Sequence, residues 1–444
     1  MSFEIKKSTQ FRINELVIVT KTSKIDISGI YDEINIFDSM FMSVISGNIL
    51  IRDSLGLSNK FLFDGSEALL IDIKKSEDSD FANFKKAFRI YKQTDRRSDR
   101  PGSEFYKLHF VTDDLIYSDQ QRINQYYEEK YSEIIKKILV DYLKAPSNNL
   151  KGLYENSFGL KKVVIPNLRP LEAIEWCAKR AVDNNDSANF VFFQNLTGYN
   201  FATLSTLLSQ KEILDIRYTT KNIESGNPIS EMQGARDLEV ISQNDNIERT
   251  RAGVNAGKFI GFDPMTGFIS TKNISYGDHY FNMKHGNKTP NFTSMQSRDG
   301  TENSKAFNSR KALSIFGYAR QYSNYIKSKD PSSISKEENI ENWFFQRKAI
   351  IRNLMSKRLK LVMPGNFQLS SGFNVNVTVP PLGLKDKKST TEDKSLSGKY
   401  VIVASRQIIG FEKHETIVEV ASSSTINDFI PSDSREQTEE ILKY

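Results

Sequence analysis

Apolar and polar residues alternate along the first quarter of the chain, between Phe3 and about Asp113. The clearest runs are Ile45, Gly47, Ile49 and Ile51, then Leu69, Ile71 and Ile73, then Tyr106, Leu108 and Phe110. A period of two places alternate side chains on one face of a strand. The pattern predicts roughly six or seven half-buried strands in a sandwich or a small barrel.

The segment from Asp95 to Gly102 interrupts these strands with mixed charges and ends in a Pro-Gly pair. Such a composition favours an exposed hairpin tip. A phosphate-binding loop is the alternative, but two aspartates offset the three arginines of the segment. We therefore predict a hairpin tip.

The apolar period changes to 3.6 between Glu128 and Leu143, which predicts an amphipathic helix. Its apolar stripe consists of Tyr131, Ile134, Ile135, Ile138, Leu139, Tyr142 and Leu143. A short strand at 162–166 leads to a second predicted helix, in which Pro170 suits the first turn. The aromatic segment 189–203 then predicts two strands joined by a turn. These elements indicate one α+β unit.

Strand-like alternation returns after Ser205, at 213–219 and 238–243. A polar stretch from Arg251 to Glu338 follows, with many Asn, Ser, Gly and Lys residues and little regular period. We expect parts of this stretch to be mobile.

Helical spacing resumes at 343–359, and strand alternation resumes at 373–379 in the clearest strand of the chain. Lys399–Ser405 then pairs with Thr416–Ala421 as a predicted hairpin across Gly410. The last twenty residues are polar, with a short possible helix at 436–442. The chain thus reads as a β unit, an α+β unit and a second β unit split by an insertion, and the similar size of the two β units hints at a duplicated fold.

Composition narrows the class of protein. The chain has 444 residues, which suggests two to four domains of ~100 to ~200 residues. It is 38% hydrophobic and 11% aromatic, which is enough for ordered cores. A net charge of +6 from 61 basic and 55 acidic residues is too small to argue for nucleic acid. We expect no membrane span and no secretory signal, and therefore folding in a cytoplasm.

The sequence offers few candidates for chemistry. The single cysteine, Cys177, lies in an apolar helical pattern that favours a structural role. The nearest approach to a metal pair is Asp278-His279 with His285, which has no further ligand nearby. Glu172 and Glu175 lie three apart on the second helix and, with the basic residues beyond them, indicate a solvated face more than a glycosidase pair.

Nucleotide chemistry usually requires a phosphate-binding loop, and acyl transfer usually requires a nucleophile motif. Both kinds of motif are absent from the sequence. We therefore predict no catalytic residue, no cofactor-binding residue and no metal ligand, and we expect the protein not to be an enzyme. No interface residue is identified.

Five segments carry a resemblance to a known family. Pro166–Ala181 resembles the central helix of baseplate hub proteins from contractile-tailed bacteriophages, and Asn189–Leu204 resembles the aromatic hairpin that follows it there. Met363–Leu369 with Gly372–Val375, and Gly398–Ser405, look like the closing barrel strands of the family, and Asn48–Ser54 resembles a first-barrel strand. One departure is Arg169, where relatives often place a small hydroxyl residue, so that the side-chain helix cap is expected to be missing.

The resemblance implies a mainly β fold with an α+β insertion, in which two related β-barrel domains, the second interrupted, accompany a helix-containing middle domain. The expected units are a first barrel at 1–113, a middle domain at 114–205, a second barrel at 206–250 and 343–423, an insertion at 251–342 and a polar tail at 424–444.

The resemblance also implies a function. Three subunits would form a ring with pseudo-sixfold character that adapts the sixfold tail tube to the threefold central spike and lines a channel for the tape measure and DNA. The implied partners are a homotrimer, the spike, the tail tube or its initiator, and the surrounding wedge proteins. The implied location is the virion tail baseplate, assembled in the host cytoplasm.

Two alternatives remain open. One is a hub with cell-wall-degrading activity, although such a domain usually needs ~100 or more additional residues. The other is the spike base of a type VI secretion machine, which resembles the same barrels.

Overall fold

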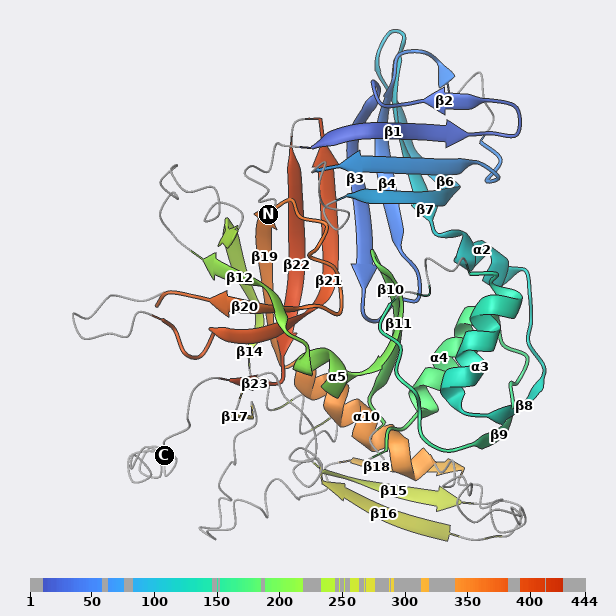
Figure 1. Cartoon of the computed structure of the whole chain (residues 1–444), viewed down its shortest axis with the longest axis vertical. Helices are drawn as coiled ribbons and strands as arrows, with labels where there is room; N and C mark the ends of the chain where they lie inside the picture. The colour runs from blue at the N-terminus through green and yellow to red at the C-terminus, as the bar shows by residue number, and fades with distance from the viewer. Residues whose placement is uncertain are drawn as a thin grey trace.

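The structure is a computed structural model. It describes residues 11–57, 63–75, 83–145, 150, 152–184, 188–218, 233–243, 247, 251, 256–262, 267, 269–275, 287, 289–290, 313–318, 340–381, 392–411 and 413–425. Within these residues the molecule consists of two β units, a helical middle unit and a small sheet at the far end (Figure 1). None of the described helices is long and apolar enough to cross a membrane.

The first β unit contains seven strands around its own apolar core. The strands are β1 (Arg12–Val19), β2 (Lys24–Asp26), β3 (Tyr31–Ser39), β4 (Ser46–Asp53), β5 (Ala68–Lys74), β6 (Phe84–Arg100) and β7 (Ser103–Val111). Their alternating aliphatic residues point inward, as with Ile49 and Ile51 on β4 and Leu108 on β7, all three of which are fully buried. The alternation predicted from the sequence is therefore confirmed, because burying one face of each strand requires it.

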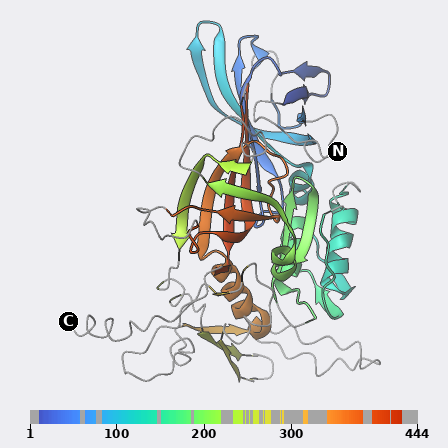
Figure 2. The ribbon, with the colours of Figure 1, turned by 60° about the vertical axis from the view of Figure 1, so that its left-hand side comes forward.

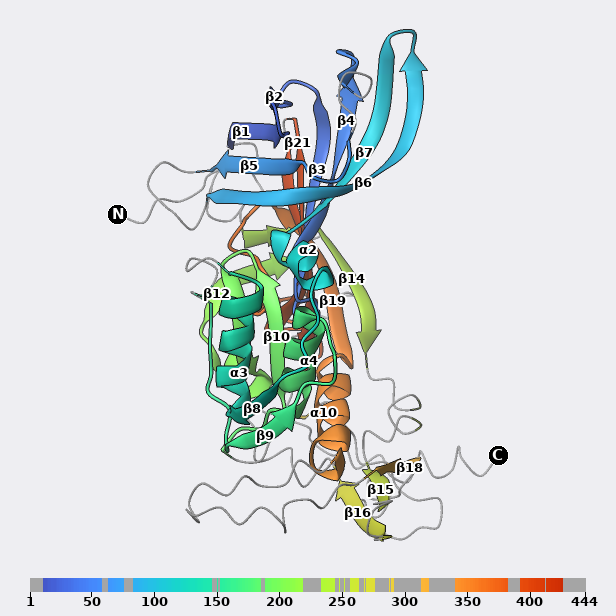
Figure 3. The ribbon, with the colours of Figure 1, turned by 90° about the vertical axis from the view of Figure 1, so that its right-hand side faces the viewer.

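The middle unit packs helices and two antiparallel strand pairs around a second core. Its elements are α2 (Asp113–Asp119), β8 (Tyr126–Glu129), α3 (Tyr131–Lys137) with a π-helical turn η2 (Ile138–Tyr142), β9 (Lys161–Val164), α4 (Pro170–Arg180), β10 (Phe190–Asn195), β11 (Gly198–Thr203) and α5 (Leu204–Ser209). Figure 3 shows α3 and α4 side by side beside the β10–β11 hairpin. The rings of Phe190 and Phe201 stack on this hairpin with centroids 4.7 Å apart.

The second β unit is a closed ring of strands. Its strands are β12 (Glu212–Tyr218), β13 (Gly234–Ala235), β14 (Asp237–Gln243), β19 (Lys357–Pro364), β20 (Asn374–Thr378), β21 (Gly398–Gly410) and β22 (His414–Ser422). Backbone pairing runs from β12 through β20, β21, β22 and β19 to β14, and β13, which directly precedes β14, pairs back to β12. Figure 2 shows these strands crossing around a common interior. The unit is a β-barrel with its own aliphatic core.

The split in the second unit holds further ordered structure. Helix α10 (Ile340–Leu354) leads into β19, and a sheet of β15 (Ala256–Phe262), β16 (Ile269–Ser275) and β18 (Leu313–Tyr318) lies near its start (Figure 1). Two short strands, β17 (Thr289–Pro290) and β23 (Ser424–Thr425), pair with each other. The low periodicity of the polar stretch concealed these strands.

The two β units are joined by strand pairing. β21 pairs β20 only up to Val401, and its remaining length, residues 404–410, pairs antiparallel with β3 of the first unit. One continuous sheet therefore runs from the first unit into the second.

The two β units also share one strand order. The first unit runs β1-β5-β6-β7-β4-β3, and the second runs β12-β20-β21-β22-β19-β14. Numbering the six strands of each unit in chain order, and omitting the short β2 and β13, gives 1-4-5-6-3-2 in both. The one difference is the first strand, which is antiparallel to its neighbour in the first unit and parallel to it in the second. The hint of a duplicated fold is confirmed at the level of topology.

Most predicted elements are confirmed, with shifted ends. The helix predicted at 128–143 begins only at Tyr131, because 126–129 pairs with β9. The helix predicted at 343–359 was wrong at its end: it stops at Leu354, and residues 357–359 already belong to β19, where pairing to β14 and β22 outweighs helical spacing. The predicted hairpin tip is confirmed, but strand β6 continues to Arg100 and only Pro101-Gly102 forms the turn. The domain boundaries stay predictions.

Candidate functional site

The most distinctive polar cluster lies where the three units meet. The Asp38 carboxylate on β3 is buried and accepts hydrogen bonds from the Ser370 and Ser405 hydroxyls and, at 2.8 Å, from the Ser371 backbone N–H. Burial raises the pKa of Asp38, and these hydrogen bonds oppose that rise. We call this cluster, together with Asn195, the junction.

The middle unit reaches the junction through the turn of its aromatic hairpin. The Asn195 amide donates to the Ser371 carbonyl at 2.9 Å, and the Leu196 backbone N–H donates to the Ser370 hydroxyl at 3.1 Å. The junction thus connects β3 of the first unit, β21 of the second and the β10–β11 turn of the middle unit. The Asp38 carboxylate and the Asn195 amide nitrogen each have partners there, which is typical of a structural network.

A second tie joins the middle unit to the first through Gln194, which is fully buried. Its amide oxygen accepts from the Ile45 backbone N–H at 3.2 Å and from the Thr112 hydroxyl at 3.0 Å. Its amide nitrogen donates to the Asp114 carboxylate at 3.3 Å. Burial raises the pKa of Asp114.

A third contact between the β units brings a lysine and a histidine together. The Lys75 ammonium, just after β5, donates to the Gly365 carbonyl, just after β19, and the His414 ring packs against Gly365. Burial lowers the pKa of Lys75 to about 7 and the pKa of His414 well below its usual value, with nearby Lys75 adding to the latter. The His414 Nε2 is 2.9 Å from the Gln407 amide oxygen.

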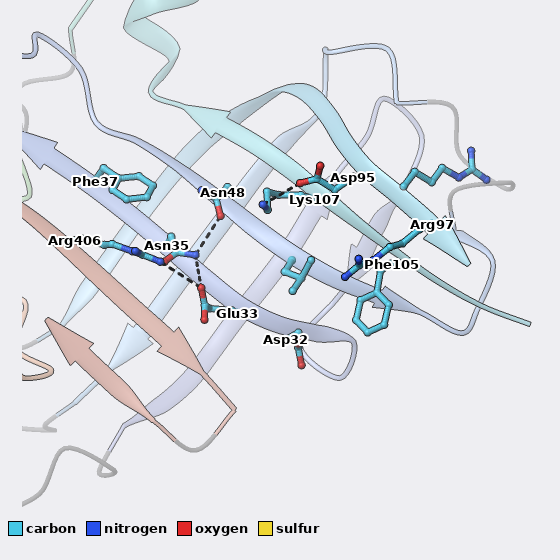
Figure 4. A pocket seen from close by; sticks show the side chains of 12 residues that line it. Asp32, Glu33, Asn35, Phe37, Asn48, Asp95, Arg97, Phe105, Lys107 and Arg406 are labelled. Carbon is cyan, nitrogen blue, oxygen red and sulfur yellow. Dashed lines mark hydrogen bonds and ion pairs between the residues drawn. The ribbon is translucent and has the colours of Figure 1, made fainter. Parts of the chain in front are cut away.

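A groove of about 740 Å³ lies on the outer face of the sheet that joins the two β units (Figure 4). Its lining comes from β3, β4, β6, β7 and β21: Asp32, Glu33, Asn35, Phe37, Asn48, Leu50, Asp95, Arg96, Arg97, Phe105, Lys107 and Arg406. The Arg406 guanidinium donates to the Asn35 amide oxygen at 2.8 Å and lies 3.7 Å from the Glu33 carboxylate. This ion pair joins β21 to β3. We call the line along which these two strands pair, and so join the two β units, the seam.

Most of the charges of the groove, though not Arg97, are neutralised by ion pairs among the described residues. Lys107 and Asp95 are 3.0 Å apart, and the hydrogen bond from Lys107 lowers the pKa of Asp95. Arg96 and Glu104 are 2.9 Å apart. A carboxylate that is held ionised by a cation is a poor general acid at neutral pH, so the groove suits polar recognition better than acid–base chemistry.

The candidate residues that the sequence offered, Cys177, Glu172 and Glu175, are buried or hydrogen-bonded within the fold. Cys177 is fully buried, and burial raises the pKa of its thiol to about 12. The Glu172 carboxylate accepts the Arg169 backbone N–H at 3.0 Å, and the Glu175 carboxylate accepts the Ser43 hydroxyl at 3.0 Å. Glu172 therefore contacts the backbone at the start of α4, and Glu175 connects α4 to the first unit.

The expected lack of a side-chain cap at Arg169 is confirmed, since a guanidinium offers no acceptor; the Leu171 backbone N–H in the first turn donates instead to the Ser118 hydroxyl at 3.1 Å. Asp278, His279 and His285 lie outside the described residues. Among the residues that are described, no group of three or more potential metal ligands comes together.

Sequence patterns alone did not reveal the junction and the seam. Asp38 follows Ile34 and Ile36 at a spacing of two, so it stands on the inward face of its strand. An acid at an inward position is a signal for a buried polar network. Its partners Ser370 and Ser405 are 332 and 367 positions away in sequence, and no local pattern identifies them.

No family model matches this chain, and no curated protein sequence matches it. Solved structures do match it. The 43 kDa tail protein of prophage MuSo2 from Shewanella oneidensis is 9% identical, covers 92% of this chain and 98% of its own, and superposes with a TM-score of 0.51. A tail protein from Neisseria meningitidis MC58 is 9% identical with a TM-score of 0.49, over 92% of this chain and 96% of its own.

The Escherichia coli c3393 protein, described as a component of the type VI secretion system, is 9% identical and covers 95% of this chain and 79% of its own, with a TM-score of 0.40. Of these, the likeness to the Shewanella protein shows a shared fold. The resemblance to phage tail proteins that the sequence indicated is confirmed at that level, and so is the mainly β fold class with helical insertions.

Proposed function

We propose that this chain is the baseplate hub subunit of a contractile-tailed phage, located in the tail baseplate and assembled in the host cytoplasm. Three copies form a ring that joins the sixfold tail tube to the threefold central spike. One observation carries the proposal: the two β units of a chain share one strand order and lie side by side in one sheet. Three copies therefore offer six similar units to a sixfold partner and threefold symmetry to a spike.

The fold shared with a prophage tail protein supports this assignment. The remaining partners follow from the position of such a ring: the tube or its initiator on one side, the spike on the other, wedge proteins around it, and the tape measure and DNA through its channel.

We propose further that the protein catalyses no reaction. This rests on the ion-paired groove and on the use of Glu172 and Glu175 in helix contacts. Purified protein that clears a peptidoglycan suspension, with the clearing abolished by Glu172→Gln or Glu175→Gln, would contradict it.

The ring is tested by the solution mass of the purified chain. Light scattering across a range of concentrations should give a particle of three times the 50.8 kDa chain mass for the chain alone, and three chains plus the mass of the bound spike when the spike is co-expressed. A monomer that persists even with the spike present would overturn the proposal.

A further inference from the structure

The seam between the two β units has a defined construction. β21 leaves β20 after Val401, shows a bulge between Ile402 and Ala404 in its ladder with β22, and then uses its freed edge to pair with β3. A strand that changes partner at a bulge is bent there, which re-aims its second half. β21 thus serves both units.

The corresponding strand of the first unit is built in the same way. β6 leaves β5 after Arg89 and shows a bulge between Ile90 and Lys92 in its ladder with β7. From Lys92 onward, however, β6 pairs only with β7 in the described part of the chain. Figure 3 shows this half projecting with β7 as a long hairpin. It presents an open edge where β21 has β3.

The counterpart of β3 is open as well. By strand order β14 corresponds to β3, and among the described residues it pairs with β19 alone. Most of its residues are exposed, including the apolar Val240 and Ile241. A chain therefore carries one satisfied seam and the two halves of a second, unsatisfied one. Unpaired edges of this length are normally covered in a native assembly.

We infer that the edge of β6 beyond Lys92 in one copy pairs antiparallel with β14 of the next copy, repeating between chains the β21–β3 seam within each chain. The inference rests on the proposed ring and specifies its joint. Because the contact is head to tail, it closes only as a ring or continues as a filament.

The β6 side of the register follows from the ladders. On β7, the partner of Thr94 lies two residues before the partner of Lys92, and the partner of Arg97 lies four residues before it. On β22, the partner of Arg406 lies two residues before the partner of Ala404, and the partner of Ile408 lies four residues before it. Thr94 therefore takes the place of Arg406, and Arg97 takes the place of Ile408.

The β14 side follows in the same way through the neighbouring strands. In the first unit, Arg89 pairs with Val111, Val111 with Ser46, and Ser46 with Phe37 across successive strands. In the second unit, Val401 pairs with Ala421, Ala421 with Arg358, and Arg358 with Ser242 in the same way. Ser242 therefore takes the place of Phe37, and by the adjoining pairs Glu239 takes the place of Asn35.

Within the chain, Arg406 faces Phe37 and Ile408 faces Asn35. Between chains, Thr94 should face Ser242 and Arg97 should face Glu239. The charges agree with this register, because both charged residues of β14, Asp237 and Glu239, are acidic, whereas Arg97 makes no ion pair within the described part of the chain. The internal seam uses the same chemistry in its Arg406–Glu33 pair.

The test is a disulfide across the joint. Directly opposed residues of antiparallel strands have a Cα separation of about 4.5–5.5 Å, which a disulfide spans. The chain carrying both Thr94→Cys and Ser242→Cys is oxidised and run on a non-reducing gel, while light scattering reports the mass of the same sample before oxidation. Cys177 does not interfere because it is buried.

The expected result is a covalent trimer as the main product, reversed by reductant, with neither single variant giving it. The pair Phe37→Cys with Arg406→Cys is the matched control, since it should close within one chain. A second control combines Thr94→Cys with Lys21→Cys, on the exposed β1–β2 turn, in place of Ser242→Cys, and should give no trimer.

The outcomes separate this inference from the proposed function. A trimeric mass without cross-linking by Thr94→Cys and Ser242→Cys, while the internal control closes, overturns the joint and leaves the ring standing. A monomeric mass without cross-links, also when the spike is co-expressed, overturns both. Covalent chains longer than three support the joint and contradict the closed ring. The charge swap Arg97→Glu with Glu239→Arg should restore the association that each single change weakens.

Discussion

The carboxylate of Asp38 on β3 accepts a hydrogen bond from the hydroxyl of Ser405 on β21, across the seam that joins the two β units. The same carboxylate binds the loop after β19 through Ser370 and Ser371. A single buried acid thus fixes the relative position of the elements on which the two-unit architecture depends.

Replacing Asp38 with alanine should destabilise the chain strongly. The change leaves two hydroxyls and one backbone N–H without an acceptor in a buried site, at an expected cost of about 3 kcal/mol in the free energy of unfolding. Urea denaturation measures this. Asp32→Ala, at an exposed position on the same strand, is the control and should change stability little. Equal effects of the two changes would mean that the junction is not what holds the units together.

Acid should loosen the contact between the two units through His414. Burial depresses the folded-state pKa of this histidine below its unfolded value of about 6.5. The folded state therefore binds fewer protons, and its stability falls as pH drops below about 6.5 toward the folded pKa. Burial also lowers the pKa of the neighbouring Lys75, to about 7. Below that pH Lys75 is protonated in both the folded and the unfolded state, so it does not change the free energy of unfolding with pH there.

The measurement is urea unfolding of the wild type and of His414→Gln at several pH values between 7.5 and 5. The wild type should lose up to about 1.4 kcal/mol per pH unit more than the variant. Parallel slopes for the two proteins would show that His414 does not titrate on unfolding.

Gly47 lies where β4 passes close to β3 and to an aromatic ring. A Cβ at this position would stand 2.3 Å from the Asn35 carbonyl oxygen and from the Phe110 ring. Backbone cannot yield as a flexible side chain can, so Gly47→Ala should cost about 3 kcal/mol or more.

Gly29→Ala is the matched control, because nothing lies within 4 Å of the methyl group that alanine would add there. It should be neutral or slightly stabilising, since alanine reduces the freedom of the unfolded chain. Thermal unfolding of the two variants side by side decides the matter, and a neutral Gly47→Ala would refute the tight packing of β3 on β4.

Lys357 is buried at the start of β19, where its ammonium finds no hydrogen-bond partner among the described residues and lies 5.0 Å from the centre of the Tyr400 ring. Burial lowers its pKa to about 8. Lys357→Met should therefore raise the free energy of unfolding by about 1 kcal/mol at neutral pH.

The free energy of unfolding of the wild type should rise as pH increases from about 8 to 10, because Lys357 stays protonated in the unfolded state over that range but not in the folded state. Lys357→Met should abolish this rise. Denaturation at pH 7 and pH 9.5 tests both expectations. A large loss of stability in the methionine variant at both values would instead assign the ammonium a partner that stabilises the fold.

The sequence predicted elements well where one face of a segment had to be buried locally. β4, β5, β7, β20 and α4 all follow from their own periodicity. The end of α10 was misplaced because residues 357–359 satisfy a helical stripe, yet they are held as strand by pairing with 420–422 of β22.

The seam and the junction could not be predicted for the same reason. The pairing of β21 with β3 joins segments near the two ends of the chain, and both strands look complete by alternation alone. Alternation along the sequence indicated two β units of similar size, but only the strand pairing showed that they share one order and one sheet.

The most direct test of the proposed hub is electron microscopy of the purified particle. We predict rings with a central hole, in which three chains contribute six similar lobes through alternating seams. Rings with three lobes only, or isolated single chains under conditions where the spike is present, would contradict the claim that the duplicated β unit exists to match sixfold and threefold partners.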